Sequence, residues 1–265
     1  MGRVGRALIL HELLERTRDR WVVVISLLFA LLSSAVSLYG RSADGSASQL
    51  TGPSLVTLAS LLIPLVALVL GHDALVGERE RNTLGLLLSL PVSRVEVVLA
   101  KFIGRLLALL CSIGLGLGAA VLVAPAGHGQ VLAQLVVPSS LLGAAFLALG
   151  VLISATARRQ VTAASLVVVI WFTLVFFYDL GLLGLLMLTD GGVSAPTIGW
   201  LVAANPAGLY RVEMLARFSG SGALDHLGVH AGVPGLLAQI GIWSAWILVP
   251  LGLSGALLAR EREMR

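Results

Sequence analysis

Apolar residues in this 265-residue chain gather into long runs that short polar segments separate. An α-helix crosses the roughly 30 Å core of a bilayer with about 20 apolar residues. The runs therefore predict an all-α integral membrane protein with six transmembrane helices, and we expect residues 1–265 to form a single membrane domain. We place the spans at Trp21–Leu38, Pro53–Leu70, Val95–Val123, Val131–Ala155, Val161–Phe177 and Leu236–Leu258.

The polar segment between the second and third spans, residues 72–94, has the most informative local pattern. Its charges alternate over Glu78–Arg81, and a polar step, a short leucine run and Pro91 follow. Ser93 and Glu96 have the spacing of a capping box, in which each side chain bonds the backbone N–H of the other residue. We expect a short helix outside the bilayer, joined rigidly to a helix of roughly 45 Å that begins at residue 94.

The other polar positions near the spans predict simpler features. Residues 1–20 carry charges of both signs among apolar residues, so we expect a helix in the membrane interface. Gly40–Gly52 predicts a short external loop. Lys101 and Arg105, near the start of the third span, should extend toward the headgroups. Pro138 should kink the start of the fourth span.

Residues 179–234, between the last two spans, predict an outer helical platform. A carboxylate in mid-bilayer would be costly, so we expect Asp179 at the outer interface, as the cap of a short helix that ends near Asp190. Asn205-Pro206 has the chemistry of an N-cap followed by N1, and predicts a second helix that ends near Phe218. The candidate contacts of this platform with a partner are Asp179, Asn205, Arg211 and Glu213.

The basic residues predict the orientation of the chain. Loops on the cytoplasmic side of a membrane protein are enriched in Lys and Arg. With six spans and both termini inside, 15 of the 18 basic residues are cytoplasmic and only Arg41, Arg211 and Arg217 are outside. We therefore expect a multi-pass protein of the bacterial inner membrane, with both termini and residues 72–94 in the cytoplasm. The sequence pI of about 10.0 reflects this topology, and nothing in the pattern indicates nucleic-acid binding.

Several kinds of chemistry have little support in the sequence. A P-loop ATPase needs a lysine within G-x-x-x-x-G-K-[ST], and Lys101, the only lysine, follows Ala100. The single cysteine, Cys111, excludes an intrachain disulfide and a metal site built from cysteines. Mean hydropathy is +0.97 with 12% charged residues, and no paired carboxylates lie within the spans. We expect a non-catalytic subunit with no metal and no cofactor of its own.

A few small patterns leave two readings open. His226 and His230 have helical metal-ligand spacing, but glycines surround them, so a solvated loop is the alternative. The thioether groups of Met187 and Met214 could be copper ligands, or the two side chains could simply pack against apolar neighbours. The pair Gly114 and Gly118 forms a GxxxG pattern, and Gly181 and Gly184 are also closely spaced; both pairs fit close helix packing or the ordinary abundance of glycine in membrane helices.

The chain as a whole resembles the permeases of ABC-2 type transporters. The six spans, the interfacial lead-in and the outer helices contribute to this resemblance, although Asn82 stands where many relatives have glycine. Within the family, the segments 86–104, 177–186 and 205–215 are most similar to permeases that serve the maturation of the copper sites of nitrous oxide reductase. The matching residues in the polar segment 72–94 and at the start of the third span are Gly77, Glu78, Arg79, Glu80, Thr83, Leu88, Pro91, Ser93, Arg94 and Lys101.

The resemblance implies a mechanism and a set of partners. Two copies of the permease would form a homodimer with two separate ATPase subunits, which bind ATP and Mg²⁺ on the cytosolic side. A periplasmic β-helix protein would bind the outer helices, and the long third helix would transmit motion outward. The residues that would couple to the ATPase are Glu78, Arg79, Glu80, Arg81, Thr83, Pro91, Ser93 and Arg94.

Two other functions remain as alternatives. A general ABC-2 exporter of a lipid, drug or glycan would share the same architecture. A secondary carrier would show broken helices or charges near the midplane, for which Asp179 is the candidate.

Overall fold

The computed structural model describes residues 3–17, 20–42, 45–89, 91–123, 133–190, 192–225 and 234–260. All regular secondary structure in these ranges is helical, which confirms the predicted all-α class. The helices are α1 (Arg3–Thr17), α2 (Arg20–Ser42), α3 (Gly45–Gly71), α4 (Val76–Glu80), α5 (Leu84–Ser89), α6 (Arg94–Val123), α8 (Val136–Thr156), α9 (Gln160–Phe172), η1 (Thr173–Phe177), α10 (Tyr178–Leu188), α11 (Ala195–Ala204), α12 (Pro206–Asp225) and α13 (Leu236–Arg260).

Within the described ranges, five helical segments are long and apolar enough to cross a membrane. The helix α2 is continuous over 23 residues, but its described apolar stretch, Ser26–Tyr39, is shorter. The structure is therefore that of a helical membrane protein, while the count of six spans remains a prediction. The five segments are Gly52–Glu80, Arg94–Val123, Val136–Thr156, Gln160–Leu188 and Leu236–Arg260.

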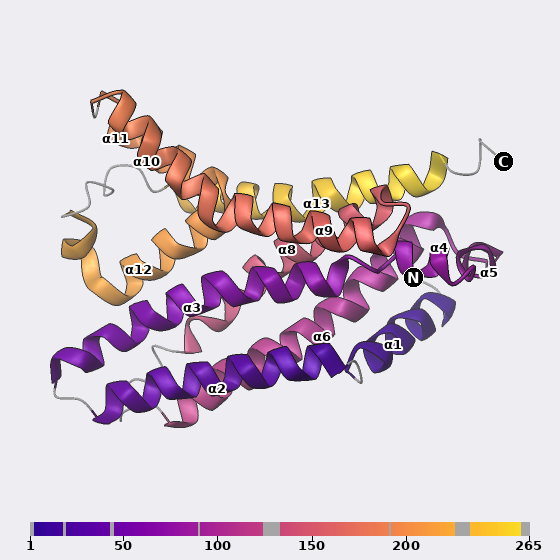
Figure 1. Cartoon of the computed structure of the whole chain (residues 1–265), viewed down its shortest axis with the longest axis horizontal. Helices are drawn as coiled ribbons and strands as arrows, with labels where there is room; N and C mark the ends of the chain where they lie inside the picture. Colours follow the sequence, from indigo (N-terminus) through magenta and orange to yellow (C-terminus); the bar gives the residue numbers. More distant parts are fainter. Residues whose placement is uncertain are drawn as a thin grey trace.

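The long helices run side by side along the length of the molecule (Figure 1). The short helices α4 and α5 lie at one end, together with α1 and the last turns of α13. We refer to this as the connector end, and to residues 72–94 as the connector. The helix α11 and most of α12 lie at the opposite end, the platform end (Figure 1). Any signal between the two ends must therefore travel along the long helices.

The helix α8 is the most enclosed of the candidate spans, since 67% of its most apolar 18-residue stretch is buried. It crosses α3 closely where Gly71 meets Gly150, because a Cβ atom added to Gly71 would lie 2.7 Å from the Cα atom of Gly150. Only glycine permits this approach. The segment Gln160–Leu188 is the least enclosed, because only 11% of its most apolar 18-residue stretch is buried.

The helix α6 packs along α2 through a glycine that the GxxxG pattern does not include. A Cβ atom on Gly116 would overlap the ring of Phe29 on α2. At Gly114 and Gly118, a Cβ atom would meet nothing within 4 Å. The GxxxG pair therefore makes no close helix contact within the described chain.

Several predicted boundaries are wrong for a common reason. The helix α2 continues to Ser42 and α3 begins at Gly45, so Gly40–Gly52 is not a loop. Likewise, α12 continues past residue 218 to Asp225. Apolar runs mark the part of a helix that lies in lipid, whereas Ser, Ala and Gln extend it further. Pro138 lies in the first turn of α8, where its missing N–H costs no helical bond, so it starts the helix without interrupting it.

The fifth span is a single helix of 29 residues from Gln160 to Leu188, to which we refer as the rod. It consists of α9, the π-helical segment η1 and α10. Asp179 is the second residue of α10, so the prediction that it caps a separate external helix is wrong. The platform instead begins with α11, which the sequence reading missed because the run 195–204 is as apolar as a span.

Candidate functional site

The connector folds as two short helices with a tight turn between them. The turn contains Asn82, whose φ angle of 56° lies in the left-handed region. Among residues other than glycine, Asn is one of the few that adopt this conformation readily. Asn can therefore form this turn without a glycine. Thr83, the next residue, donates its hydroxyl hydrogen to the Glu78 carboxylate and so closes the turn.

The capping box predicted at the start of α6 is confirmed. The N–H of Ser93 donates to Oε2 of Glu96 at 3.0 Å, and the N–H of Glu96 donates to Oγ of Ser93 at 3.2 Å. Pro91 is exposed just before this box. The helix α6 then covers Arg94–Val123, as predicted. The connector therefore enters α6 through a fixed turn.

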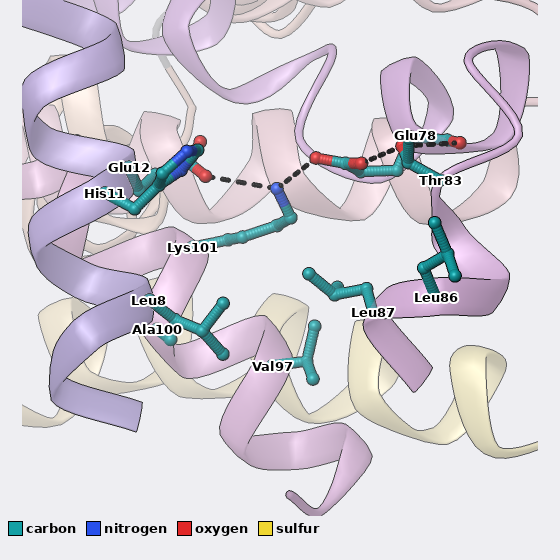
Figure 2. Close-up of a pocket in the computed structure, with 10 residues that line it drawn as sticks. All are labelled: Leu8, His11, Glu12, Glu78, Thr83, Leu86, Leu87, Val97, Ala100 and Lys101. Carbon is teal, nitrogen blue, oxygen red and sulfur yellow. Dashed lines mark hydrogen bonds and ion pairs between the residues drawn. The ribbon is translucent and has the colours of Figure 1, made fainter. Parts of the chain in front are cut away.

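A buried ion network links the connector to α1 and α6. Lys101 Nζ lies 3.1 Å from Oε2 of Glu12 and 2.9 Å from Oε1 of Glu78 (Figure 2). Arg105 donates through Nε to Oε1 of Glu12 at 2.6 Å, and through Nη1 to Asp73. Arg16 lies 2.9 Å from Asp73 and completes the network. Three acidic and three basic side chains thus neutralise one another.

The prediction that Lys101 and Arg105 extend toward the headgroups is wrong. Lys101 is 6% exposed and Arg105 is fully buried. The cause is Glu12, a residue of α1 that the sequence reading missed. Its side chain provides a buried counter-ion, and charged groups remain buried when they are paired and hydrogen-bonded.

The charge of Glu12 is maintained by its surroundings. Burial alone would raise the pKa of the Glu12 carboxyl. The positive charges of Arg105, Lys101 and Arg16 outweigh this effect and lower the pKa to about 2. The carboxylate therefore stays ionised at any physiological pH.

Arg79 of the connector caps the end of α8. Its Nη1 atom donates to the carbonyls of Ser154 and Ala157, at 3.1 and 2.7 Å, and its Nη2 atom donates to the carbonyl of Ala155 at 3.0 Å. The last carbonyls of a helix lack partners within it, and a cation there also interacts favourably with the helix dipole. Oγ of Ser154 in turn accepts the N–H groups of Leu75 and Val76 at the start of α4.

Two further connector residues bind the ends of other helices. Oε1 of Glu80 accepts the N–H of Gln160, the first residue of α9, at 2.7 Å. Arg94 donates to the carbonyl of Leu258 near the end of α13. Arg81 is more peripheral, since it lies 3.6 Å from Glu15 and its side chain is half exposed. The connector thus bonds the ends of α8, α9 and α13 at once.

A cavity of about 400 Å³ opens between α1, the connector and α6 (Figure 2). The carboxylates of Glu12 and Glu78 and the ammonium group of Lys101 form its polar side. Apart from His11 and Thr83, the rest is formed by leucine, valine and alanine side chains, and Leu86 at its edge is 71% exposed. The other lining residues are Leu8, His11, Thr83, Leu87, Val97 and Ala100.

At the platform end, Asp179 and Arg211 form an ion pair. The distance from Oδ2 of Asp179 to Nη2 of Arg211 is 2.5 Å, which joins the rod to α12. Glu213 pairs with Arg217 on the same helix at 2.6 Å. Arg211 and Glu213, two of the candidate partner contacts, are thus each already paired with a nearby residue of opposite charge.

Asn205 has two roles at the platform end. Its Oδ1 atom accepts the N–H of Ala207 at 3.0 Å, which confirms the predicted N-cap of α12. Its Nδ2 atom donates to the carbonyl of Leu174 within η1 at 2.5 Å. Asn205 is 1% exposed, so its side chain joins α12 to the rod and does not form part of the surface.

Residues 6–262 of the chain match the protein family described as ABC-2 family transporter protein. The chain is 38% identical over 264 residues to the probable ABC transporter permease protein NosY of Stutzerimonas stutzeri, covering 94% of this chain and 96% of that relative. It is 37% identical over 265 residues to the protein of the same name from Pseudomonas aeruginosa, with the same coverage.

The chain belongs to the ABC-2 transporter family. It is thus a membrane component of an ABC transporter, and its similarity to NosY permeases extends over almost the whole length. The ABC-2 membership confirms the resemblance drawn from the connector pattern.

In this ABC-2 protein, six of the eight predicted connector residues fall into two groups, whereas Arg81 and Pro91 are exposed at the edge. The first group, Glu78 and Thr83, contributes to the cavity and its ion pairs. The second group, Arg79, Glu80, Ser93 and Arg94, binds helix ends or starts a helix. The residues missed were Glu12 and Asp73, although Leu8, Glu12 and Arg16 share one helical face at i, i+4 spacing, which indicates a charged buried face.

The metal-binding readings find limited support in the described residues. No group of three His, Cys, Asp or Glu side chains within the described ranges could hold a metal ion. Met214 is fully buried in the core, whereas Met187 is exposed. His226 and His230 lie outside the described residues. Packing is therefore the better reading for Met214.

Proposed function

We propose that the chain is the permease subunit of an ABC transporter complex that couples ATP hydrolysis by a separate ATPase subunit to periplasmic copper-site assembly in nitrous oxide reductase. The observation that best supports a role in coupling is the position of the connector at the ends of three helices. Arg79, Glu80 and Arg94 bond the ends of three long helices, so a force applied to this one segment reaches most of the bundle. The similarity to NosY permeases supports the specific process.

The ATPase activity belongs to a partner in this proposal. Lys101, the only lysine, is buried between Glu12 and Glu78, and it follows no glycine-rich loop. The chain therefore carries no Walker A lysine of its own. Two NosF-like subunits would bind ATP and Mg²⁺ and drive two copies of this chain.

The ATPase subunit would dock at the connector end. The cavity beside α5 has apolar walls, and Leu86 is largely exposed on a helix of only 6 residues outside the candidate spans. Exposed apolar surface of this kind is typical of a protein contact. An apolar side chain of the ATPase subunit would fill the cavity, while Arg81, Pro91 and Ser93 contribute to the surrounding surface.

The platform would face the periplasm and bind a NosD-like β-helix protein. Because Asp179 with Arg211 and Glu213 with Arg217 are paired, the platform offers partly exposed ion pairs, to which a polar partner surface is complementary. Asn205 would contribute indirectly, by holding α12 in position. In this orientation, the connector and both termini lie in the cytoplasm.

Complementation tests the proposed process. The chain is expressed in a Stutzerimonas stutzeri strain that lacks its NosY relative, and nitrous oxide reductase is purified from the periplasm. We expect the enzyme to regain its copper content and visible absorption, whereas a strain with an empty vector yields enzyme without its copper centres.

The same experiment separates the alternative function. If the chain inserts in the membrane and binds the ATPase subunit, but the reductase stays without copper, the specific proposal is wrong. A general ABC-2 exporter of a lipid, drug or glycan would then be the better assignment.

A further inference from the structure

The rod has polar attachments at both of its ends and, between them, a hydrogen bond of 3.1 Å from Nε1 of Trp171 to the carbonyl of Leu61 on α3. At the connector end, Oε1 of Glu80 accepts the N–H of Gln160 at 2.7 Å. At the platform end, Asp179 pairs with Arg211 at 2.5 Å. Only 11% of the most apolar 18-residue stretch of the rod is buried, against 39% for that of α6 and 67% for that of α8. Within this chain, the rod therefore has less packing to lose on moving than either of these helices.

The platform is fastened to the rod at further points. Nδ2 of Asn205 donates to the carbonyl of Leu174 at 2.5 Å, and the hydroxyl of Tyr178 donates to the carbonyl of Leu201 on α11 at 2.6 Å. The N–H of Tyr178 bonds the carbonyl of Thr173, five residues back, which is π-helical geometry. Such segments are frequent at functional sites in helices. Both platform helices are thus bonded directly to the rod.

The helix α6 is held more firmly along its length. The ion network fixes its first half to α1, and it packs against α2 through Gly116 and through a hydrogen bond of 2.7 Å between Ser26 and Ser112. A displacement of α6 relative to α1 would separate Lys101 and Arg105 from Glu12, and buried ion pairs are costly to separate. The third span is therefore poorly suited to the transmission role that the sequence suggested.

We propose that the rod transmits movement of the connector to the platform, with Glu80 and Arg211 as positioning residues at its two ends. This inference rests on the proposed function, since it requires an ATPase that moves the connector. Residues 160 and 179 are roughly 28 Å apart along a helix, which is close to the thickness of a bilayer core. The hydrogen-bonded helix resists compression along its axis, so an axial displacement at Gln160 reaches Asp179.

The backbone at the start of the rod permits a sharp test. Arg159 has φ −129° and ψ 143°, which is the conformation that a following proline favours, and Gln160 is the first helical residue. The substitution Gln160→Pro therefore removes the N–H that Glu80 accepts without breaking α9. Gln160→Ala is the matched control, because it removes the side chain but keeps this N–H.

The measurement uses the full complex of the permease with its ATPase subunit in lipid nanodiscs. Cys111 is replaced by Ser, and Thr197, exposed on α11, is replaced by Cys as a reporter. The rate of labelling with an impermeant thiol reagent is compared without nucleotide and after trapping with ATP and vanadate. In the chain that keeps Gln160 and in Gln160→Ala, we expect the labelling rates without nucleotide and after trapping to differ by roughly fivefold or more. We expect no difference with Gln160→Pro, while ATPase binding and ATP hydrolysis persist.

A second variant tests the other end of the rod. Asp179→Asn should also reduce the nucleotide-dependent difference at position 197, because one of the attachments between the rod and the platform is lost, and the charge exchange Asp179→Arg with Arg211→Asp should restore it. Glu96→Ala, which removes the acceptor for the Ser93 N–H and so weakens the start of α6, should leave the difference unchanged.

The role of the rod is overturned if Gln160→Pro keeps the nucleotide-dependent difference, or if Glu96→Ala abolishes it. It is also overturned if Gln160→Pro prevents ATPase binding where Gln160→Ala does not. If the chain with Gln160 does not bind the ATPase subunit at all, the proposed function itself fails. If the chain with Gln160 binds the ATPase subunit and ATP is hydrolysed, but the labelling rate at position 197 does not change, only the role of the rod is contradicted and the proposed function stands.

Discussion

At the scale of single residues, the most consequential side chain is Glu12. It is 3% exposed and touches both Lys101 and Arg105, so its charge makes the burial of two cations tolerable. Removal of one partner from a buried ionic group leaves an uncompensated charge, which costs more than the pair contributes. The network therefore depends on Glu12 more than on any surface ion pair.

We predict that Glu12→Gln destabilises the protein by about 3–5 kcal/mol, because two buried cations lose their shared carboxylate. Thermal unfolding of the purified permease in detergent measures this change. Glu15→Gln on the same helix is the control; its side chain is 37% exposed, so a change of about 0–1 kcal/mol is expected. Equal effects of the two substitutions would show that the network is not a stabilising feature.

The pH dependence of this difference follows from the lowered pKa of Glu12. Its contribution is fully present above the ordinary value of 4.5 and is lost as the pH falls toward about 2. The difference in melting temperature between the parent chain and Glu12→Gln should thus be constant from about pH 8 to about pH 5, and decrease below that range. A decrease already between pH 8 and pH 6 would contradict the assigned cause.

At the scale of elements, the connector acts through the ends of helices. Arg79 bonds three carbonyls in the last turn of α8 and the residue that follows it, and Glu80 bonds the first N–H of α9. Two neighbouring residues of opposite charge thus hold the two helix ends at the turn 157–159, each at the end that its charge stabilises. The alternation of charge along α4 has this local physical reason.

We predict that Arg79→Lys loosens the turn between α8 and α9. An ammonium group is a compact donor and cannot bond three carbonyls in the planar arrangement of a guanidinium group. Amide hydrogen exchange should accelerate by roughly tenfold at residues 157–160, equivalent to the loss of about 1.4 kcal/mol of local stability. Exchange at the start of α6, which the Ser93–Glu96 box holds, serves as the internal control and should not change.

At the scale of the whole molecule, the connector and the platform lie at opposite ends of the bundle (Figure 1). The connector end carries α1, α4, α5 and the end of α13, whereas α11 and most of α12 form the other end. Such a separation suits a protein that passes movement from one side of a membrane to the other. The excess of basic residues near the connector predicts that this end faces the cytoplasm.

We predict that Thr156 faces the cytoplasm and Thr197 the periplasm. Each residue is exposed, and each is replaced by Cys in turn in a chain that carries Cys111→Ser. In intact cells, an impermeant thiol reagent should label the cysteine at position 197 and should label the one at position 156 only after lysis. The reverse pattern would overturn the orientation.

Local sequence alone determined the features that depend on neighbours in the chain. The capping box of Ser93 and Glu96, the N-cap of Asn205 and the bounds of α6 were predicted correctly, because each arises within a few residues or from one long apolar run. The membrane class and the family followed in the same way, from repeated apolar runs and a contiguous motif.

The tertiary structure alone decided where the charges go. Glu12 and Lys101 are 89 residues apart in the sequence, and Asp179 and Arg211 are separated by 32 positions, so no local pattern pairs them. The sequence reading placed Lys101, Arg105 and Arg211 in polar surroundings, because a lone charge in an apolar environment is costly. The fold removes that cost with a counter-ion from another helix, and only the packing of the bundle specifies which one.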